Sequence, residues 1–173
     1  MLNPSAALDD LRQRAKEGQK LTFKFFRDGP FSQWHRAPFR LDGDNYPTAE
    51  HYLMARKARH FKDDVALRQI MDTPDPRLAK QYGRMVKNFK DEEWAKVRFE
   101  IAVAGNFAKF SQHALLKQLL LNTGVQYLVE ASVEDTIWGI GMRDTDTDAR
   151  NPCQWKGTNL LGFVLINVRM LLR

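Results

Sequence analysis

Apolar residues recur every three or four positions along most of this chain, which is the pattern of amphipathic helices. Residues 4–17 form the first such stretch, which Gly18 ends. The same spacing predicts five more helices. Two lie in the first half of the chain, one from an N-cap at Thr48 to about Phe61 and one from Asp63 or Asp64 to before Pro74. The other three run from Asp91 to about Phe110, through 115–120 after a cap at Ser111, and through 161–171 after a cap at Thr158. We therefore expect a mainly helical fold.

Short strands are predicted in only a few places. Alternating and aromatic residues around the turn at 28–30 favour a strand or two within 21–34, and 39–41 favours another. Residues 127–130 are typical of a short buried strand, whereas 138–157 show no period and predict one long polar loop. The predicted fold class is thus mainly α, a single domain with a few short β-strands. We take residues 1–20 as an N-terminal helical extension and residues 21–173 as the main domain.

Composition agrees with one globular domain, because the 173 residues are 43% hydrophobic and 28% charged. No apolar run approaches the roughly 18 residues that a bilayer span needs. The first 16 residues also lack the cationic-then-apolar order of a secretory signal. A single cysteine, Cys153, excludes an internal disulfide and a thiolate metal cage. We expect a cytoplasmic protein with no membrane partner.

The formal net charge of +6 favours anionic partners but does not choose between them. Phosphorylated metabolites and nucleic acid both suit this charge. The basic residues are scattered along the chain and form no Lys/Arg block.

One predicted helix carries a candidate pair of functional side chains. Glu50 and Lys57 lie on the same face, with Met54 and Phe61 between and beyond them, at spacings of four, three and four. Two turns separate Glu50 from Lys57 by roughly 10 Å, a distance suited to opposite sides of one small ligand. A solvated helix face would show the same charges, although its apolar companions indicate partial burial.

Further candidates combine glycine with polar or aromatic residues. Asp135 and Trp138 run directly into Gly139, where an aromatic ring beside a carboxylate can hold a base or a sugar. A capped turn at a strand end would look similar. Arg84 follows Gly83, and Asn159 follows Gly157, so each pairs a glycine with a donor suited to phosphate or a hydroxyl, or merely marks a helix end.

Several classes of site are not indicated. The four histidines lack the spacing of metal ligands, and the alternating Asp144, Asp146 and Asp148 lack the glycine and glutamate of a calcium loop. Cys153 lacks a neighbouring histidine and is interpreted as a surface thiol. There is no GxGxxG, P-loop or GxSxG motif.

From about residue 22 onwards, the chain resembles the YbiA-like proteins, also called the NADAR family of N-glycosidases. Each matching segment is short, and their order and spacing make the resemblance specific. The segments are 43–52, Lys57-Ala58 with Phe61, Gly83-Arg84, Trp94 with Arg98, 108–110, 119–124, Val129-Glu130 with Asp135, Trp138-Gly139, and 157–162. The chain departs from the family at Gln33 and Trp34, where many members have asparagine and phenylalanine.

The resemblance implies a mainly helical fold and a hydrolase that cleaves the ribose C1′–N bond, with no metal or organic cofactor. Members act on phosphoribosylamino-pyrimidine intermediates of riboflavin biosynthesis, or remove ADP-ribose from modified guanine, including guanine in DNA. The first substrate, a small phosphorylated ribosyl-amine, is our leading expectation. ADP-ribosylated nucleic acid is the alternative partner, and a non-catalytic ADP-ribose-binding module is the alternative from another class.

Breaking such a bond develops positive charge on the sugar, which requires a nearby carboxylate. We assign Glu50 as general base or cation stabiliser and Asp135 to the ribose hydroxyls. Lys57 either binds phosphate or attacks the opened ribose as an amine. The substrate-binding candidates are Arg84, Trp94, Trp138, Gly139 and Asn159, although Trp94 also fits a core position.

Overall fold

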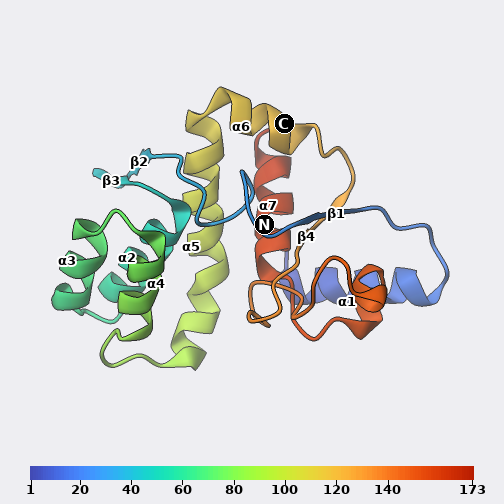
Figure 1. Cartoon of the computed structure of the whole chain (residues 1–173), viewed down its shortest axis with the longest axis horizontal. Helices are drawn as coiled ribbons and strands as arrows, with labels where there is room; N and C mark the ends of the chain where they lie inside the picture. Colours follow the sequence, from blue (N-terminus) through green and yellow to red (C-terminus); the bar gives the residue numbers. More distant parts are fainter. The chain divides into compact units, whose positions relative to one another are not determined.

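The structure is a computed structural model that describes residues 1–173 and contains seven α-helices (Figure 1). The chain forms two compact units, one of residues 1–32 with 115–173 and one of residues 33–114. The helices are α1 (Pro4–Lys16), α2 (Ala49–His60), α3 (Asp64–Asp72), α4 (Pro76–Arg84), α5 (Asp91–Gln112), α6 (Ala114–Leu121) and α7 (Leu160–Leu171). The strands are β1 (Phe23–Phe26), β2 (Phe39–Leu41), β3 (Asp44–Tyr46) and β4 (Tyr127–Glu130), and two short 3₁₀ helices are η1 (Thr147–Arg150) and η2 (Pro152–Gln154).

In the unit formed by both ends of the chain, β1 pairs in parallel with β4, with Phe23 opposite Tyr127 and Phe26 opposite Glu130. Helix α7 packs on β4 and buries an almost continuous apolar run. Because the two central residues of β4 are also buried, the contact between α7 and β4 forms part of the core of this unit.

Helix α1 belongs to the same unit. Asn3 caps its first turn, and Leu8 and Leu11 are buried. The Arg12 side chain donates to the Pro152 carbonyl at 3.3 Å, and the Leu2 amide donates to Asn167 Oδ1 at 2.9 Å. These contacts hold α1 against η2 and α7, so the predicted extension is packed into its unit.

In the unit of residues 33–114, β2 and β3 form an antiparallel hairpin, and α2, α3 and α4 pack side by side (Figure 1). Helix α5 is the longest helix, with 22 residues, and it also packs on α2. Gly105 makes this contact close, because a Cβ there would lie 2.4 Å from the Tyr52 ring. A larger residue at 105 would push α5 away from α2.

The predicted fold class, mainly α with a few short strands, is confirmed by the secondary structure. Thr48 and Asp63 cap α2 and α3 as predicted, through bonds to the amides of His51 and Ala66. The strands at 39–41 and 127–130 are also observed at the predicted residues. The boundary between residues 20 and 21 stays a prediction.

Other predicted boundaries are wrong. Ser111 does not cap a helix, because α5 continues to Gln112. Thr158 donates its hydroxyl to the Ile137 carbonyl instead of capping α7, and the N-cap position belongs to Asn159 in a left-handed conformation. The long loop contains η1 and η2, and sequence periodicity gave no sign of α4 or β3.

A helix must be long and apolar to span a bilayer. None of them combines the length and the apolar character needed to cross a membrane.

Candidate active site

Glu50 lies in the first turn of α2 and is only 4% exposed. Its amide donates to the Gln33 carbonyl at 3.0 Å, which satisfies a donor that has no acceptor within the helix. The neighbouring His51 ring bonds the Thr48 hydroxyl at 2.8 Å and the Thr73 carbonyl at 3.0 Å. The start of α2 is therefore fixed on several sides, and so is the backbone that carries the Glu50 carboxyl.

Lys57, two turns further along α2, is 8% exposed. Its Nζ lies 3.7 Å from the centre of the Phe89 ring. Burial lowers the pKa of Lys57, Arg84 lowers this pKa further, and Asp91 opposes the shift. The amine is thus easier to deprotonate than an exposed lysine, which suits the predicted attack on the opened ribose, while its neighbour Arg84 suits the predicted phosphate contact.

Arg84 ends α4, which packs closely on α2. A Cβ on Gly83 would lie 2.0 Å from Met54 Sδ, so glycine permits this approach. The exposed Arg84 side chain is close enough to Lys57 to affect its pKa. Two cations near one another favour an anion such as phosphate.

Trp94 is 5% exposed, and its ring lies 6.1 Å from that of His60. His60 in turn contacts Phe61, which contacts Phe89 under the Lys57 amine. Trp94 therefore occupies a core position whose ring contacts lead to Lys57.

In the other unit, Asp135 shapes the turn that carries Trp138. Its Oδ1 accepts from the amides of Ile137 at 3.1 Å and Trp138 at 2.8 Å. Gly139 is buried, and a Cβ there would lie 2.9 Å from the carbonyl oxygens of Asp135 and Glu130. Only glycine fits this crossing of main chains without a shift, and the Trp138 side chain stays half-buried.

Asn159 connects this turn to β4. Its Oδ1 accepts from the Glu130 amide at 3.0 Å, and its Nδ2 donates to the Leu128 carbonyl at 2.9 Å. The Asn159 amide also donates to the Gly139 carbonyl at 3.1 Å. With 1% exposure and φ of 54°, Asn159 holds the turn, β4 and the start of α7 together.

The predicted residues thus form two groups, each described within its own unit. Glu50, Lys57, Arg84 and Trp94 belong to the unit of residues 33–114. The remaining candidates, Asp135, Trp138, Gly139 and Asn159, belong to the unit that contains both ends of the chain. Within the first group, Lys57 and Arg84 interact electrostatically, and within the second a hydrogen bond joins Gly139 to Asn159.

Several buried polar residues were not among the predicted site residues, and Gln33 and Lys109 are two of them. Gln33, at 7% exposure, supplies the carbonyl that bonds the Glu50 amide. Lys109 on α5 is fully buried, and burial lowers its pKa to about 7. A lysine within the apolar-rich segment 108–110 was the available signal for Lys109, and the departure from the family pattern at 33–34 was the signal for Gln33.

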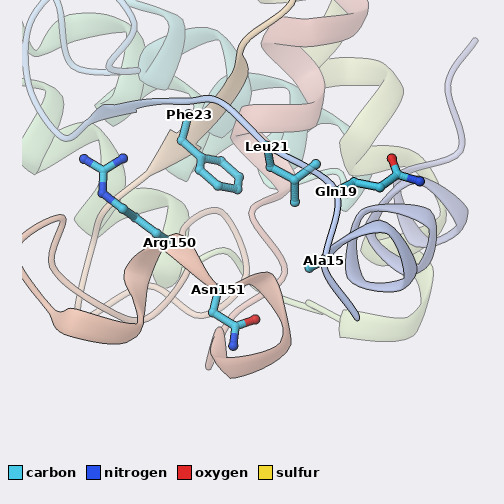
Figure 2. A pocket seen from close by; sticks show the side chains of 6 residues that line it. All are labelled: Ala15, Gln19, Leu21, Phe23, Arg150 and Asn151. Atoms are coloured by element: carbon cyan, nitrogen blue, oxygen red, sulfur yellow. The ribbon is translucent and has the colours of Figure 1, made fainter. Parts of the chain in front are cut away.

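A pocket of about 240 Å³ lies in the unit that contains both chain ends (Figure 2). None of the predicted site residues is among the residues that line it. Gln19, Leu21 and Phe23 line it from the segment that leads into β1, while Arg150 and Asn151 line it from η1 and the next residue. Ala15 of α1 completes the lining.

No three histidine, cysteine, aspartate or glutamate side chains are grouped so that they could hold a metal ion. Within the 144–148 loop, the Asp146 carboxylate has a local role, since its Oδ2 accepts from the Arg143 amide at 2.9 Å. Cys153 is half-buried, and its Sγ lies 3.6 Å from the Arg12 carbonyl oxygen.

Comparison with known proteins identifies the family behind this arrangement. The family model of the NADAR domain matches residues 23–173. The chain belongs to the NADAR family. An N-glycosidase of Acanthamoeba polyphaga mimivirus is 41% identical to this NADAR protein over 144 residues, which are 80% of this chain and 85% of the viral one.

The N-glycosidase YbiA of Escherichia coli is 33% identical over 141 residues, which cover 82% of this NADAR chain and 79% of YbiA. The NMR structure of E. coli YbiA matches with a TM-score of 0.72 and 31% sequence identity, covering 89% of this chain and 86% of that one. The predicted family is thereby confirmed, and so is the enzyme class, hydrolases of N-glycosyl bonds, to which these NADAR relatives belong by name.

Proposed function

We propose that this NADAR protein hydrolyses the bond between the ribose anomeric carbon and the nitrogen of phosphoribosylamino-pyrimidine intermediates of riboflavin biosynthesis. The observation that carries the proposal is the buried carboxyl of Glu50 on the same helix as the buried Lys57, which lies near a second cation, Arg84. Glu50 and Lys57 are seven positions apart on the helix, which separates them by roughly 10 Å along the axis. One end of a small phosphorylated sugar can meet the acid while the other meets the cations.

Glu50 is assigned to the reacting carbon. As the C–N bond breaks, the ribose ring gains oxocarbenium character, which a carboxylate stabilises. The same carboxylate can accept the proton of the attacking water. Rigid support of the α2 N-terminus by Gln33, Thr48 and Thr73 favours this role, because catalysis depends on accurate placement of the acid.

Lys57 and Arg84 are assigned to the phosphate end of the substrate. The pairing of two cations supports a phosphate contact by Lys57. The lowered pKa of Lys57 equally meets a requirement of the second route, in which its neutral amine adds to C1′ of the ring-opened ribose imine. The C1′–N bond to the aminopyrimidine then breaks, the aminopyrimidine leaves, and a Schiff base between Lys57 and the sugar remains. Both routes end in water releasing the sugar.

The remaining residues are assigned by their geometry. Asp135 is oriented by two amide donors and is assigned to the ribose hydroxyls, and Trp138 beside it to binding the sugar. Gly139 allows the close turn beside Trp138. We assign Asn159 and Trp94 to positioning the residues around them. Both the oxygen and the nitrogen of the Asn159 carboxamide form hydrogen bonds to β4, and Trp94 is packed in the core.

The alternative substrate, ADP-ribosylated guanine in nucleic acid, involves the same bond and differs in size. The net charge of +6 favours it, since each phosphate that a cation neutralises releases counterions. The two substrates therefore predict different responses to salt.

A paired assay tests the proposal. The purified protein is incubated with a phosphoribosylamino-pyrimidine and, separately, with single-stranded DNA that carries ADP-ribosylated guanine, each at low and high salt. Ribose 5-phosphate from the first substrate alone is the expected result. ADP-ribose release from the DNA alone, falling steeply with salt, would replace the proposal with the alternative, and turnover of neither would favour a binding module.

A further inference from the structure

The segment that precedes β2 is attached directly to the candidate catalytic acid. The Gln33 carbonyl accepts the amide hydrogen of Glu50 at 3.0 Å, in the first turn of α2. This bond fixes the main chain at Gln33 and Trp34 relative to the main chain of Glu50. The main chain of Gln33 therefore lies next to that of the candidate catalytic acid, and Trp34 follows it directly.

The Gln33 side chain is 93% buried, and its Nε2 has no hydrogen-bond partner in the protein. A buried amide nitrogen without an acceptor is unfavourable, and native proteins retain few of them. The two N–H donors of the Gln33 side chain would gain an acceptor if a substrate oxygen bound there, and this would explain why the protein keeps them. The amide then serves recognition, at some cost to the free protein.

Trp34, the next residue, shows the opposite burial. It is 42% exposed, which is unusual for so large an apolar ring, and Lys80 Nζ of α4 lies 5.9 Å from the ring centre. Exposed tryptophan rings provide a flat surface on which nucleobases stack, with little preference for one base. The Lys80 amine places a positive charge beside that surface.

We propose that Gln33 and Trp34 form the subsite for the leaving base, and that this subsite selects planar nitrogen heterocycles bearing a ring carbonyl. Trp34 stacks on the heterocycle, and the Gln33 carboxamide donates to its carbonyl oxygen. Both residues act on specificity and binding of the base, while bond cleavage stays with Glu50. The inference rests on the proposed function, because it takes the substrate to be an N-riboside cleaved near Glu50.

Kinetics with the phosphoribosylamino-pyrimidine test the stacking half. We expect Trp34→Ala to raise KM about tenfold or more while kcat changes less than about threefold, because base stacking binds without taking part in cleavage. Phe107→Ala is the matched control, since Phe107 is a similarly exposed aromatic residue of the same unit, at 38%. It should leave both constants unchanged. Equal KM values for wild type and Trp34→Ala would overturn the stacking role.

Gln33→Leu tests the recognition half, because leucine has a similar size and no donor. We expect its KM to rise about tenfold, while its melting temperature stays equal to that of wild type or increases, since the amide nitrogen has no partner to lose. A fall in melting temperature together with weaker binding would show a structural amide and overturn the proposal. Gln33→Asn should restore part of the affinity.

Fluorescence separates this inference from the proposed function. Stacking on Trp34 should quench its emission when the phosphoribosylamino-pyrimidine is added, and Trp34→Phe should lack that quenching. Quenching that depends on Trp34 without hydrolysis would overturn the proposed function and keep the subsite. Hydrolysis at wild-type efficiency by both Trp34→Ala and Gln33→Leu would overturn the subsite and keep the function.

Discussion

Helices α2 and α7 each have 12 residues and are buried on most sides, yet they bury different kinds of side chain. In α7 the buried run is led by Leu161, Val164 and Leu165, which are removed from water completely. In α2 the buried residues include Glu50 and Lys57. Burial of apolar groups stabilises a fold, whereas burial of a carboxyl and an amine costs desolvation free energy.

The difference separates stability from function. Helix α7 is explained by its packing on β4 and α1, and its buried Arg169 donates to the Thr123 hydroxyl at 2.7 Å and the Gln126 carbonyl at 2.9 Å. Helix α2 keeps charged groups where apolar ones would stabilise the fold more, so its composition is explained by chemistry. Substitutions in α7 should therefore change the free energy of unfolding, and substitutions in α2 should change turnover.

The largest effect is expected at the acid. Glu50→Gln keeps the size and polarity of the side chain and removes its charge, so turnover should fall about 100- to 10,000-fold. The measurement is kcat on the phosphoribosylamino-pyrimidine, with circular dichroism to verify folding. Glu100→Gln, an exposed glutamate of α5, is the matched control. Near-normal turnover of folded Glu50→Gln would remove Glu50 from the mechanism.

The α7 counterpart is Leu165→Ala. Truncating a fully buried leucine should lower the free energy of unfolding by about 2–5 kcal/mol, because apolar contacts are lost and a cavity remains. Urea denaturation measures this change, and Leu171→Ala, at a position 57% exposed on the same helix, should change it little. The folded variant should keep wild-type kcat. Lost turnover at unchanged stability would contradict the division of tasks.

Lys57 comes next. Lys57→Met should lower kcat/KM about 100-fold, because either role requires the nitrogen. Lys57→Arg then separates the roles, since a guanidinium can bind phosphate but cannot form a Schiff base. Retained activity would assign the phosphate role. Loss of activity, with a borohydride-trapped sugar adduct on wild type, would assign the amine role, and wild-type kcat/KM for Lys57→Met would contradict both.

The smallest predicted effect extends the comparison to Lys109 of α5. Burial lowers the pKa of Lys109 to about 7, so the unfolded chain holds this proton more tightly than the folded one. Stability should therefore rise with pH above about 7, by about 1 kcal/mol between pH 7 and 8. Denaturation of wild type and Lys109→Met at both pH values measures the difference. An identical pH response of the two proteins would contradict the shift.

Local signals in the sequence predicted much of the fold. Side chains that cap helices through their own neighbours, as at Thr48 and Asp63, were found because their partners lie three residues away. Asn159 was missed as the N-cap of α7 because its conformation is left-handed and its side chain bonds β4, about 30 residues earlier. Helix α4 was missed because it follows Pro74 and begins at Pro76, although proline is favourable at the start of a helix.

The candidate site was likewise predicted only where its features depend on neighbouring residues of the sequence. Helical spacing placed Glu50 and Lys57 on one face of α2, and at 135–139 the sequence left a capped turn open as the alternative to a ligand site. The proximity of Arg84 to Lys57 depends on the contact of Gly83 with Met54, which no local pattern encodes. The bond from Glu50 to Gln33 spans 17 residues, and only the fold reveals it.

The most direct test of the account identifies the bond that the enzyme breaks. Proton NMR follows the anomeric signal of a phosphoribosylamino-pyrimidine mixed with the wild-type protein, while the phosphorus signal is recorded in parallel. We predict that free ribose 5-phosphate and the free aminopyrimidine appear in equal amounts, with the phosphate ester intact. An unchanged substrate, or release of inorganic phosphate in place of the base, would contradict it.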